Sequence, residues 1–351
     1  MEFYHKFVGM NKALLYLLAI CFLMVSCEDA ETEKPSSKSE NLDSLVLAFP
    51  DSVPLLIKHG TKMIASYDYE TALADAAKAF RLDSNNIAAR MLYAEVLNNK
   101  PGKTVADVAA AQRHYKIIVN KEPKNTKALV GLAASYRQQM DFESTFKYVN
   151  EALRIDPKCR DAYVLKGSSY VFLKDFKLAK SSYETAVQQD PNFFEAYIML
   201  GSIYQGEGDK LCIEYYTTAL QLKPNDMDAT YALAYAEHLF GSLEDAKTLY
   251  RKMAGDTSEF YVARGLFHQG YIKQFSDEAI DSAIYYYNSA LKTSPMHVES
   301  WYNLGLCYFD KKENTKALQS FSKTLKYARQ QGYNEDFIEQ VEDKAKEVKL
   351  K

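Results

Sequence analysis

Hydrophobic residues recur with helical spacing along most of this chain, and small residues take fixed places within that pattern. The clearest stretch runs from residue 160 to residue 193. Its apolar faces consist of Tyr163, Gly167 and Tyr170 in a first predicted helix and of Ala179, Tyr183 and Ala186 in a second. Pro191 follows the second helix, where proline cannot continue the helical hydrogen bonding. The stretch therefore predicts two amphipathic helices joined by a short turn.

The same positions can be followed over roughly 300 residues, which gives between eight and nine units at a period of about 34 residues. The small residues of the first helices are Gly60, Ala94, Ala133, Gly167, Gly201, Ala234, Gly265 and Gly305. Those of the second helices are Ala72, Ala111, Thr145, Ala179, Cys212, Ala246, Ala283 and Ala317. One turn later the second helices carry Ala76, Tyr115, Val149, Tyr183, Tyr216, Tyr250, Tyr287 and Phe321. Helices can approach closely where small residues meet, and a ring from the next turn fills the remaining space.

A second well-defined unit, residues 298–325, contains Trp301, Leu304, Gly305 and Tyr308 in its first helix. This pattern resembles the tetratricopeptide repeat (TPR), in which Trp, Leu-Gly and Tyr are followed by Ala, an aromatic residue, Ala and Pro. The prolines that end second helices here are Pro123, Pro157, Pro191, Pro224 and Pro295. The resemblance implies an all-α, right-handed α-solenoid of about eight TPR-like helix pairs over residues 53–331.

The last segment, residues 332–351, is expected to be a capping helix and tail, because a solenoid end needs a helix that is apolar inside and polar outside. Its predicted buried stripe is Phe337, Val341, Ala345 and Val348. Units two and seven carry insertions between their helices, and in unit seven His268 stands where the pattern has Tyr. The insertions interrupt the register of the repeat in these two units.

The N-terminus, residues 1–26, predicts an export signal: Lys6 and Lys12 precede an apolar run from Ala13 to Val25. That run is shorter than the roughly 20 apolar residues of a spanning helix. Ser26 and Cys27 follow it, and this order resembles a bacterial lipoprotein signal, which implies cleavage before Cys27 and lipidation of its thiol. A plain secretory signal or an uncleaved anchor is the alternative, and the true start could be Met1 or Met10.

Residues 27–52 are expected to form the lipidated cysteine and a flexible acidic tether, because the segment after Cys27 is polar and rich in carboxylates. Acidic residues directly after such a cysteine resemble the export signals of surface-exposed lipoproteins. A linker facing the periplasm is the alternative. Both place the protein in the bacterial cell envelope as an outer-membrane lipoprotein.

Charge and side-chain chemistry exclude several classes of partner and site. The chain has 43 Lys and Arg against 46 Asp and Glu, a net charge of −3, so we expect no nucleic-acid partner. Cys212 and Cys307 occupy helix-packing positions, and Cys159 lies in an inter-repeat turn where it could be exposed. The histidines are scattered without metal-ligand spacing, and no nucleophile motif is present. The sequence therefore predicts no metal, no cofactor and no catalysis.

The resemblance also implies where a partner binds, since the fifth, ninth and twelfth residues of TPR units line a groove. The fifth positions are Met91, Val130, Val164, Ile198, Tyr231, Val262 and Tyr302. The ninth and twelfth positions include Arg137, Val171, Tyr235, His238, Leu306 and Phe309. No fifth position holds Lys, so the carboxylate clamp of some TPR adaptors is not expected. An apolar or amphipathic peptide segment is the expected ligand.

The function expected from these features is a membrane-anchored, non-catalytic scaffold that binds a protein or peptide partner. A permanent structural subunit of an outer-membrane assembly or secretion complex is the alternative. Small-molecule or glycan capture through the many tyrosines stays open, whereas an enzyme would need a polar pocket that the sequence does not indicate.

Overall fold

The computed structural model describes residues 42–350, and within that range it contains 18 helices and no strand. The chain divides into two compact units, of which the first ends at Leu200 and the second begins at Gly201. The predicted all-α fold is confirmed. The export signal and the lipidated Cys27 lie outside the described residues.

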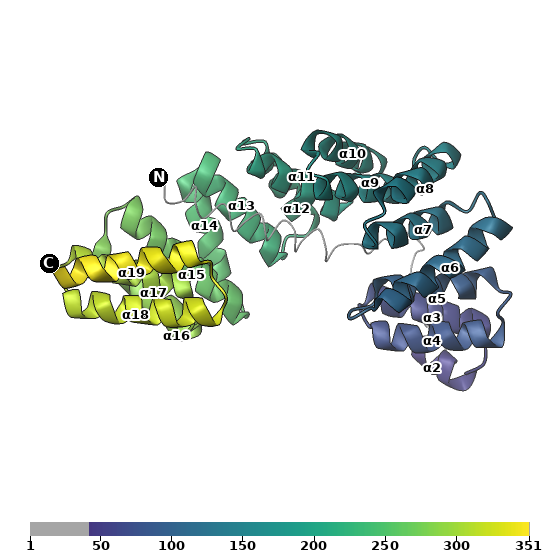
Figure 1. The fold of residues 1–351 in the computed structure, drawn as a ribbon, viewed down its shortest axis with the longest axis horizontal. Helices are drawn as coiled ribbons and strands as arrows, with labels where there is room; N and C mark the ends of the chain where they lie inside the picture. The colour runs from purple at the N-terminus through teal and green to yellow at the C-terminus, as the bar shows by residue number, and fades with distance from the viewer. Residues whose placement is uncertain (1–41, 351) are drawn as a thin grey trace, which may run out of the picture. The chain divides into compact units, whose positions relative to one another are not determined.

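The first unit contains helices α2 to α10 and the first half of α11 (Figure 1). Their bounds are α2 Leu42–Ala48, α3 Val53–Ala65, α4 Tyr69–Leu82, α5 Ile87–Asn99, α6 Val105–Lys121, α7 Thr126–Gln138, α8 Phe142–Ile155, α9 Arg160–Phe172, α10 Phe176–Gln189 and α11 Phe194–Gly206. Helix α2 was not predicted, because its seven residues fall in the expected tether. It packs on α3, and Asp43 receives a hydrogen bond from Lys62 at 2.8 Å.

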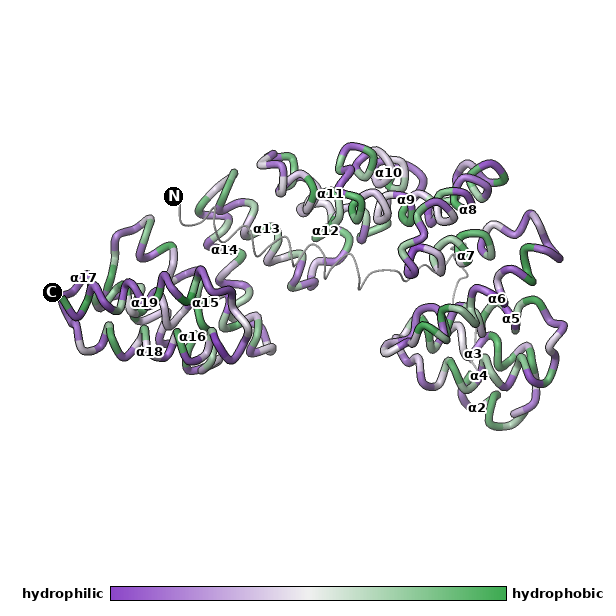
Figure 2. Tube along the Cα trace, in the orientation of Figure 1, coloured by the Kyte–Doolittle hydropathy of each residue, from purple (hydrophilic) through white to green (hydrophobic). Residues whose placement is uncertain are grey.

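The second unit contains the rest of α11 and helices α12 to α19. Their bounds are α12 Cys212–Leu222, α13 Met227–Phe240, α14 Leu243–Ala254, α15 Glu259–Phe275, α16 Ile280–Thr293, α17 Val298–Asp310, α18 Asn314–Gln330 and α19 Glu335–Leu350. From α3 to α18 the helices follow one another as eight pairs, in agreement with the predicted repeat. Hydrophobic and hydrophilic positions alternate along these helices (Figure 2), as expected of amphipathic helices that bury one face.

Aspartates at the turn within several pairs fix where the second helix begins. Asp68, Asp141 and Asp175 each precede a second helix, and each carboxylate accepts a hydrogen bond from a backbone N–H in the first turn. Such caps satisfy donors that would otherwise lack a partner at a helix start. The prolines predicted to end second helices lie two residues beyond them, as Pro157 does after Ile155. The sequence therefore sets both ends of these helices.

The small residues meet at the helix seams, as predicted. All eight small positions of the second helices are buried, and Ala72 and Ala317 have no exposed surface. In the first helices, a Cβ added to Gly305 would lie 2.7 Å from the ring of Phe321, and one added to Gly201 would lie 2.6 Å from the ring of Tyr216. A side chain cannot be accommodated at these places without displacing the ring.

Unit seven differs from the predicted register. A Cβ on Gly265 would meet the backbone of the preceding helix α14, 2.6 Å from Tyr250 O, rather than the partner helix α16. The glycine beneath the ring of Tyr287 is Gly270, at 2.8 Å. The assignment of Gly265 to the seam within the pair was therefore wrong. Gly265 instead matches a second series of buried small residues, namely Ala89, Ala128, Ala162, Ala196, Ala229 and Ser300. The first three of these pack in clusters with residues of the preceding second helix.

The C-terminal helix α19 caps the second unit by packing on α18. Phe337, Val341 and Val348 of the predicted stripe are buried, together with Ile338, whereas Ala345 is partly exposed. The opposite side of α19 carries its charged residues, including the ion pair of Lys346 with Asp343. This division matches the requirement that a terminal helix shield the repeat core from water.

Candidate functional site

A row of aromatic and histidine rings crosses from α13 to α15 in the second unit. We call it the first-helix face, and it comprises Tyr231, Tyr235 and His238 of α13 with Phe260, Arg264, His268 and Tyr271 of α15. Residues three or four apart on a helix share one side of it, so each helix contributes one stripe. The contacts run in register: Tyr231 and Tyr235 lie 5.5 and 6.4 Å from the ring of His268, and His238 lies 5.8 Å from Tyr271.

At one end of this face, the guanidinium of Arg264 lies between two rings. Its Cζ is 4.4 Å from the ring centroid of Tyr231 and 4.8 Å from that of Phe260. Arg264 is partly buried, whereas Phe260 is 56% exposed. Stacking of a guanidinium on aromatic faces is favourable and leaves its in-plane N–H donors available.

Toward the middle of the face, His268 is buried and stacks flat on Tyr250 of α14, with ring centroids 4.5 Å apart and planes at 5°. Burial lowers the pKa of His268 well below its ordinary value, and the neighbouring His238 and Arg264 lower it further. The imidazole is therefore neutral near pH 7. Its buried Nδ1 and the buried hydroxyl of Tyr250 have no hydrogen-bond partner within the described part of the chain.

The predicted groove residues divide according to their burial. Six are buried, namely Met91, Val130, Val164, Val171, Tyr235 and Tyr302, and seven are partly exposed, namely Arg137, Ile198, Tyr231, His238, Val262, Leu306 and Phe309. Met91 and Val130 belong to hydrophobic core clusters with the second helices. The partly exposed residues are thus the ones that a partner can reach without unfolding a unit.

Tyr302 is covered by the capping helix. Its ring lies 5.6 Å from Phe337, and Gln340 donates a hydrogen bond to its hydroxyl at 3.2 Å. Burial raises the pKa of Tyr302 to about 12. The expected role of Tyr302 in an open groove is therefore corrected: α19 occupies that place, and the side chain stabilises the cap.

The sequence analysis missed Arg264 and Tyr271, and it placed Val262 at the fifth position of unit seven. The register error explains Val262 and Tyr271, because counting from Gly270 makes Phe267 the fifth residue and Tyr271 the ninth. Arg264 is not a fifth, ninth or twelfth residue in either register, so the groove pattern could not have found it. A second signal was present in the sequence. Phe260, Arg264, His268 and Tyr271 follow the spacing of one helical stripe, which indicates a shared face whatever the register.

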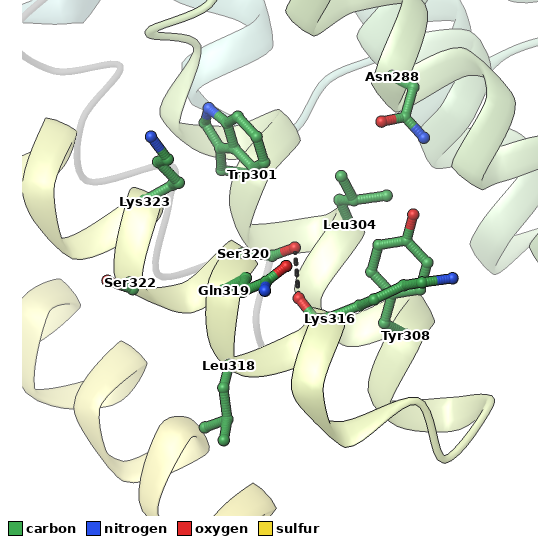
Figure 3. Close-up of a pocket in the computed structure, with 10 residues that line it drawn as sticks. All are labelled: Asn288, Trp301, Leu304, Tyr308, Lys316, Leu318, Gln319, Ser320, Ser322 and Lys323. Carbon is green, nitrogen blue, oxygen red and sulfur yellow. Dashed lines mark hydrogen bonds between the residues drawn. The ribbon is translucent and has the colours of Figure 1, made fainter.

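A separate cavity of about 620 Å³ lies between α16, α17 and α18 (Figure 3). Its lining includes Trp301, Leu304 and Tyr308, and the stem of Lys316 runs beside the Tyr308 ring. The ammonium group of Lys316 lies 5.2 Å from that ring and pairs with Glu313 at 2.6 Å. The indole N–H of Trp301 donates to Pro295 O at 2.9 Å, so this ring is held by the inter-repeat turn.

Three cysteines lie within residues 42–350. Cys159, Cys212 and Cys307 are free thiols and all are buried, and burial raises their pKa values. The expectation that Cys159 could be exposed is corrected, since it packs with Ala152 and Ala162 in the core. Within residues 42–350, no group of three or more His, Cys, Asp or Glu side chains could hold a metal ion. None of the described helices is both long enough and apolar enough to span a membrane.

Comparisons with known proteins agree with this geometry. Two sequence-family models, both described as tetratricopeptide repeat, match the chain, one at residues 213–259 and 278–334 and the other at residues 161–193 and 194–226. The chain therefore contains tetratricopeptide repeats. No curated protein matches it.

Solved structures with the same fold include human IFIT1, determined as a dimer with m7Gppp-AAAA. It is 17% identical, with 88% of this chain and 76% of that chain covered and a TM-score of 0.57. The APC/C hetero-tetramer Cut9-Hcn1 is 17% identical, with 87% of this chain and 57% of that chain covered and a TM-score of 0.51. At this level of identity the likeness shows the helical-repeat fold alone.

Proposed function

We propose that this chain is a membrane-anchored scaffold that binds an apolar or amphipathic segment of a protein partner on the first-helix face. TPR proteins are generally non-catalytic adaptors with protein or peptide partners, and the TPR fold is suited to such a role. The observation that carries the proposal is the row of rings shared by α13 and α15, from Tyr231 to Tyr271. No metal, cofactor or nucleic acid takes part.

The rings supply binding energy with little loss of side-chain freedom. Tyr231 and His238 are already held by neighbouring rings, so a partner orders few additional side chains when it binds. Apolar area removed from water contributes roughly 25 cal/mol per Å², and aromatic side chains bury large areas. The row therefore suits a helix or an extended segment that presents apolar side chains along one side.

Single-residue changes on this face test the binding role. Tyr231→Ala and Tyr271→Ala remove partly exposed rings, whereas the matched control Tyr285→Ala removes a ring that is 67% exposed on the second helix α16. Crosslinking in intact cells, followed by mass spectrometry, should identify a partner with wild type and Tyr285→Ala but not with the two face variants. Equal recovery with all four proteins would contradict the proposal.

Purification without a crosslinker separates an exchanging adaptor from the alternative of a permanent subunit. An adaptor should yield its partner at variable ratio and lose it on dilution. A subunit should co-purify at fixed stoichiometry through a large interface.

The membrane anchor is proposed from Cys27 and the apolar run before it, in a bacterial cell envelope and at the outer membrane. Stable anchoring takes two or more acyl chains, as a lipidated N-terminal cysteine provides. Labelling with palmitate should mark wild type and leave Cys27→Ala unlabelled. Label on the variant would refute lipidation at this residue, and protease treatment of whole cells would distinguish a surface-exposed from a periplasmic protein.

A further inference from the structure

We propose that Arg264 is the anion-binding point of the first-helix face and receives a carboxylate of the bound peptide. The inference rests on the proposed function, since it assigns a chemistry to the segment that the face would hold. It predicts an acidic side chain, or a C-terminal carboxylate, next to the apolar residues of the partner.

Arg264 differs from the other stacked arginines of the chain in the use of its donors. Arg160 lies 4.5 Å from the Phe193 ring and pairs with the carboxylates of Asp161 and Asp190 at 2.8 and 2.6 Å. Its donors are therefore satisfied within the fold. Such bidentate and charge-assisted contacts are the usual state of a partly buried guanidinium.

Arg90, the other comparison, lies 4.9 Å from the Phe80 ring, donates to Ser84 O at 2.6 Å and lies 3.2 Å from His114 Nδ1. Arg264 lies against two rings, those of Tyr231 and Phe260, yet it makes no hydrogen bond or ion pair with any residue in the described range 42–350. Its five N–H donors are unused by the fold, although its position is fixed by two rings. A guanidinium held in place with unused donors is prepared to bind an acceptor.

Glu299 lies near Arg264, since both charges act on Tyr231 and His297, but the two side chains form no ion pair in the described part of the chain. Glu299 is engaged elsewhere, because it accepts a hydrogen bond from the Tyr333 hydroxyl at 2.7 Å and lies 3.6 Å from His297 Nδ1. Burial lowers the pKa values of His268 and His297, so these rings are neutral near pH 7. The guanidinium of Arg264 is thus held against aromatic rings with no carboxylate bonded to it, and attraction to an anion on such a surface is stronger than in water.

One cation in an apolar surface favours a peptide carboxylate over a nucleic acid. Neither α13 nor α17 contains Lys or Arg, and Lys273 of α15 pairs with Asp277 at 2.7 Å. Nucleic-acid binding needs several cations that follow successive phosphates, and the chain has a net charge of −3. A single carboxylate between apolar side chains matches the single guanidinium between Tyr231 and Phe260.

The test uses the full chain and a displayed library of random twelve-residue peptides. Peptides selected on wild type should share an acidic residue or free C-terminus at a constant spacing from apolar residues. Replacing that carboxylate by its amide should raise the Kd roughly ten-fold or more, because a charged hydrogen-bonded pair is lost. This comparison leaves the protein unchanged, so it is independent of any folding defect.

The protein variants complete a double-mutant cycle. Arg264→Met should raise the Kd of the acidic peptide by a similar factor and leave the Kd of its amide form unchanged. Arg264→Lys should retain part of the preference for the acidic peptide over the amide. Arg251→Met, which removes an exposed arginine of α14, is the matched control and should bind as wild type does. Melting curves of each variant check that the second unit stays folded.

The outcomes separate this inference from the proposed function. If no library peptide binds wild type, the proposed function and this inference both fail. If apolar peptides bind wild type and Arg264→Met equally and the amide change has no effect, only the role of Arg264 is overturned. Binding of a ten-nucleotide RNA that depends on Arg264, without any preference for acidic peptides, would also overturn the carboxylate assignment.

Discussion

The hydroxyl of Tyr287 donates a hydrogen bond to Oε1 of Gln274, at 2.8 Å, between the two helices of one repeat. Tyr216 and Gln205 form the same contact at 2.9 Å in another repeat. Each glutamine follows the glycine beneath the ring by four residues, which is the twelfth position of its unit. This position was expected to line the groove, but in these units it satisfies a buried phenol.

Gln274→Leu should therefore destabilise the second unit. The change leaves the buried Tyr287 hydroxyl without an acceptor, which costs about 1–3 kcal/mol of unfolding free energy. Adding Tyr287→Phe removes the hydroxyl that lacks an acceptor, so the double variant should recover most of the lost free energy of unfolding. Urea unfolding of the full chain, followed by circular dichroism, measures both values. A double variant as unstable as Gln274→Leu would show that the glutamine acts by packing and not by its hydrogen bond.

Gly305→Ala should destabilise the last repeat by about 1–3 kcal/mol, because the added methyl would lie 2.7 Å from the Phe321 ring in a closely packed seam. Gly206→Ala is the matched control. Nothing lies within 4 Å of its added Cβ, and alanine is the better helix former, so its effect should be neutral or slightly stabilising. Thermal melting of both variants decides the point. A harmless Gly305→Ala would mean that the seam is looser than the structure shows.

The sequence was sufficient to predict the helix pairs and their seams, because small residues, aromatic rings and prolines recur at fixed positions that contacts within a pair require. It could not choose between Gly265 and Gly270. Both are buried glycines, and only the neighbouring helices show that one faces α14 and the other faces Tyr287. It also could not show that α19 covers Tyr302, because that contact joins separate segments. Face positions therefore depend on tertiary contacts that a periodic pattern does not contain.

His268→Phe should reduce the pH dependence of stability. Burial lowers the pKa of His268 below its ordinary value of 6.5. As the pH falls below 6.5, His268 therefore becomes protonated in the unfolded chain while it stays neutral in the folded chain. The stability contributed by the neutral ring is thus present above pH 6.5 and is lost as the pH falls, by at most about 1.4 kcal/mol per pH unit. Phenylalanine retains the stack on Tyr250 and does not titrate.

Urea midpoints at pH 7.5 and pH 5.0 measure this effect. The difference between the two midpoints should be smaller in His268→Phe than in wild type. It should not vanish, because burial also lowers the pKa values of His238 and His297 in the same unit. An unchanged difference would mean that His268 is protonated as readily in the folded as in the unfolded chain.

Phe337→Ala should release the capping helix before it affects the rest of the second unit. The Phe337 side chain is 7% exposed, and its ring contacts Tyr302 and Tyr333 at 5.6 and 5.4 Å. Loss of a buried phenylalanine costs about 3–5 kcal/mol, and a terminal helix can undock alone. Hydrogen exchange should therefore accelerate over α19 while the helices from α12 to α16 stay protected. Leu350→Ala, at a side chain 88% exposed on the same helix, should exchange as wild type does. Uniform acceleration across the unit would instead make α19 an integral part of the repeat core, and Tyr302 would then be a core residue and not the surface beneath a removable cap.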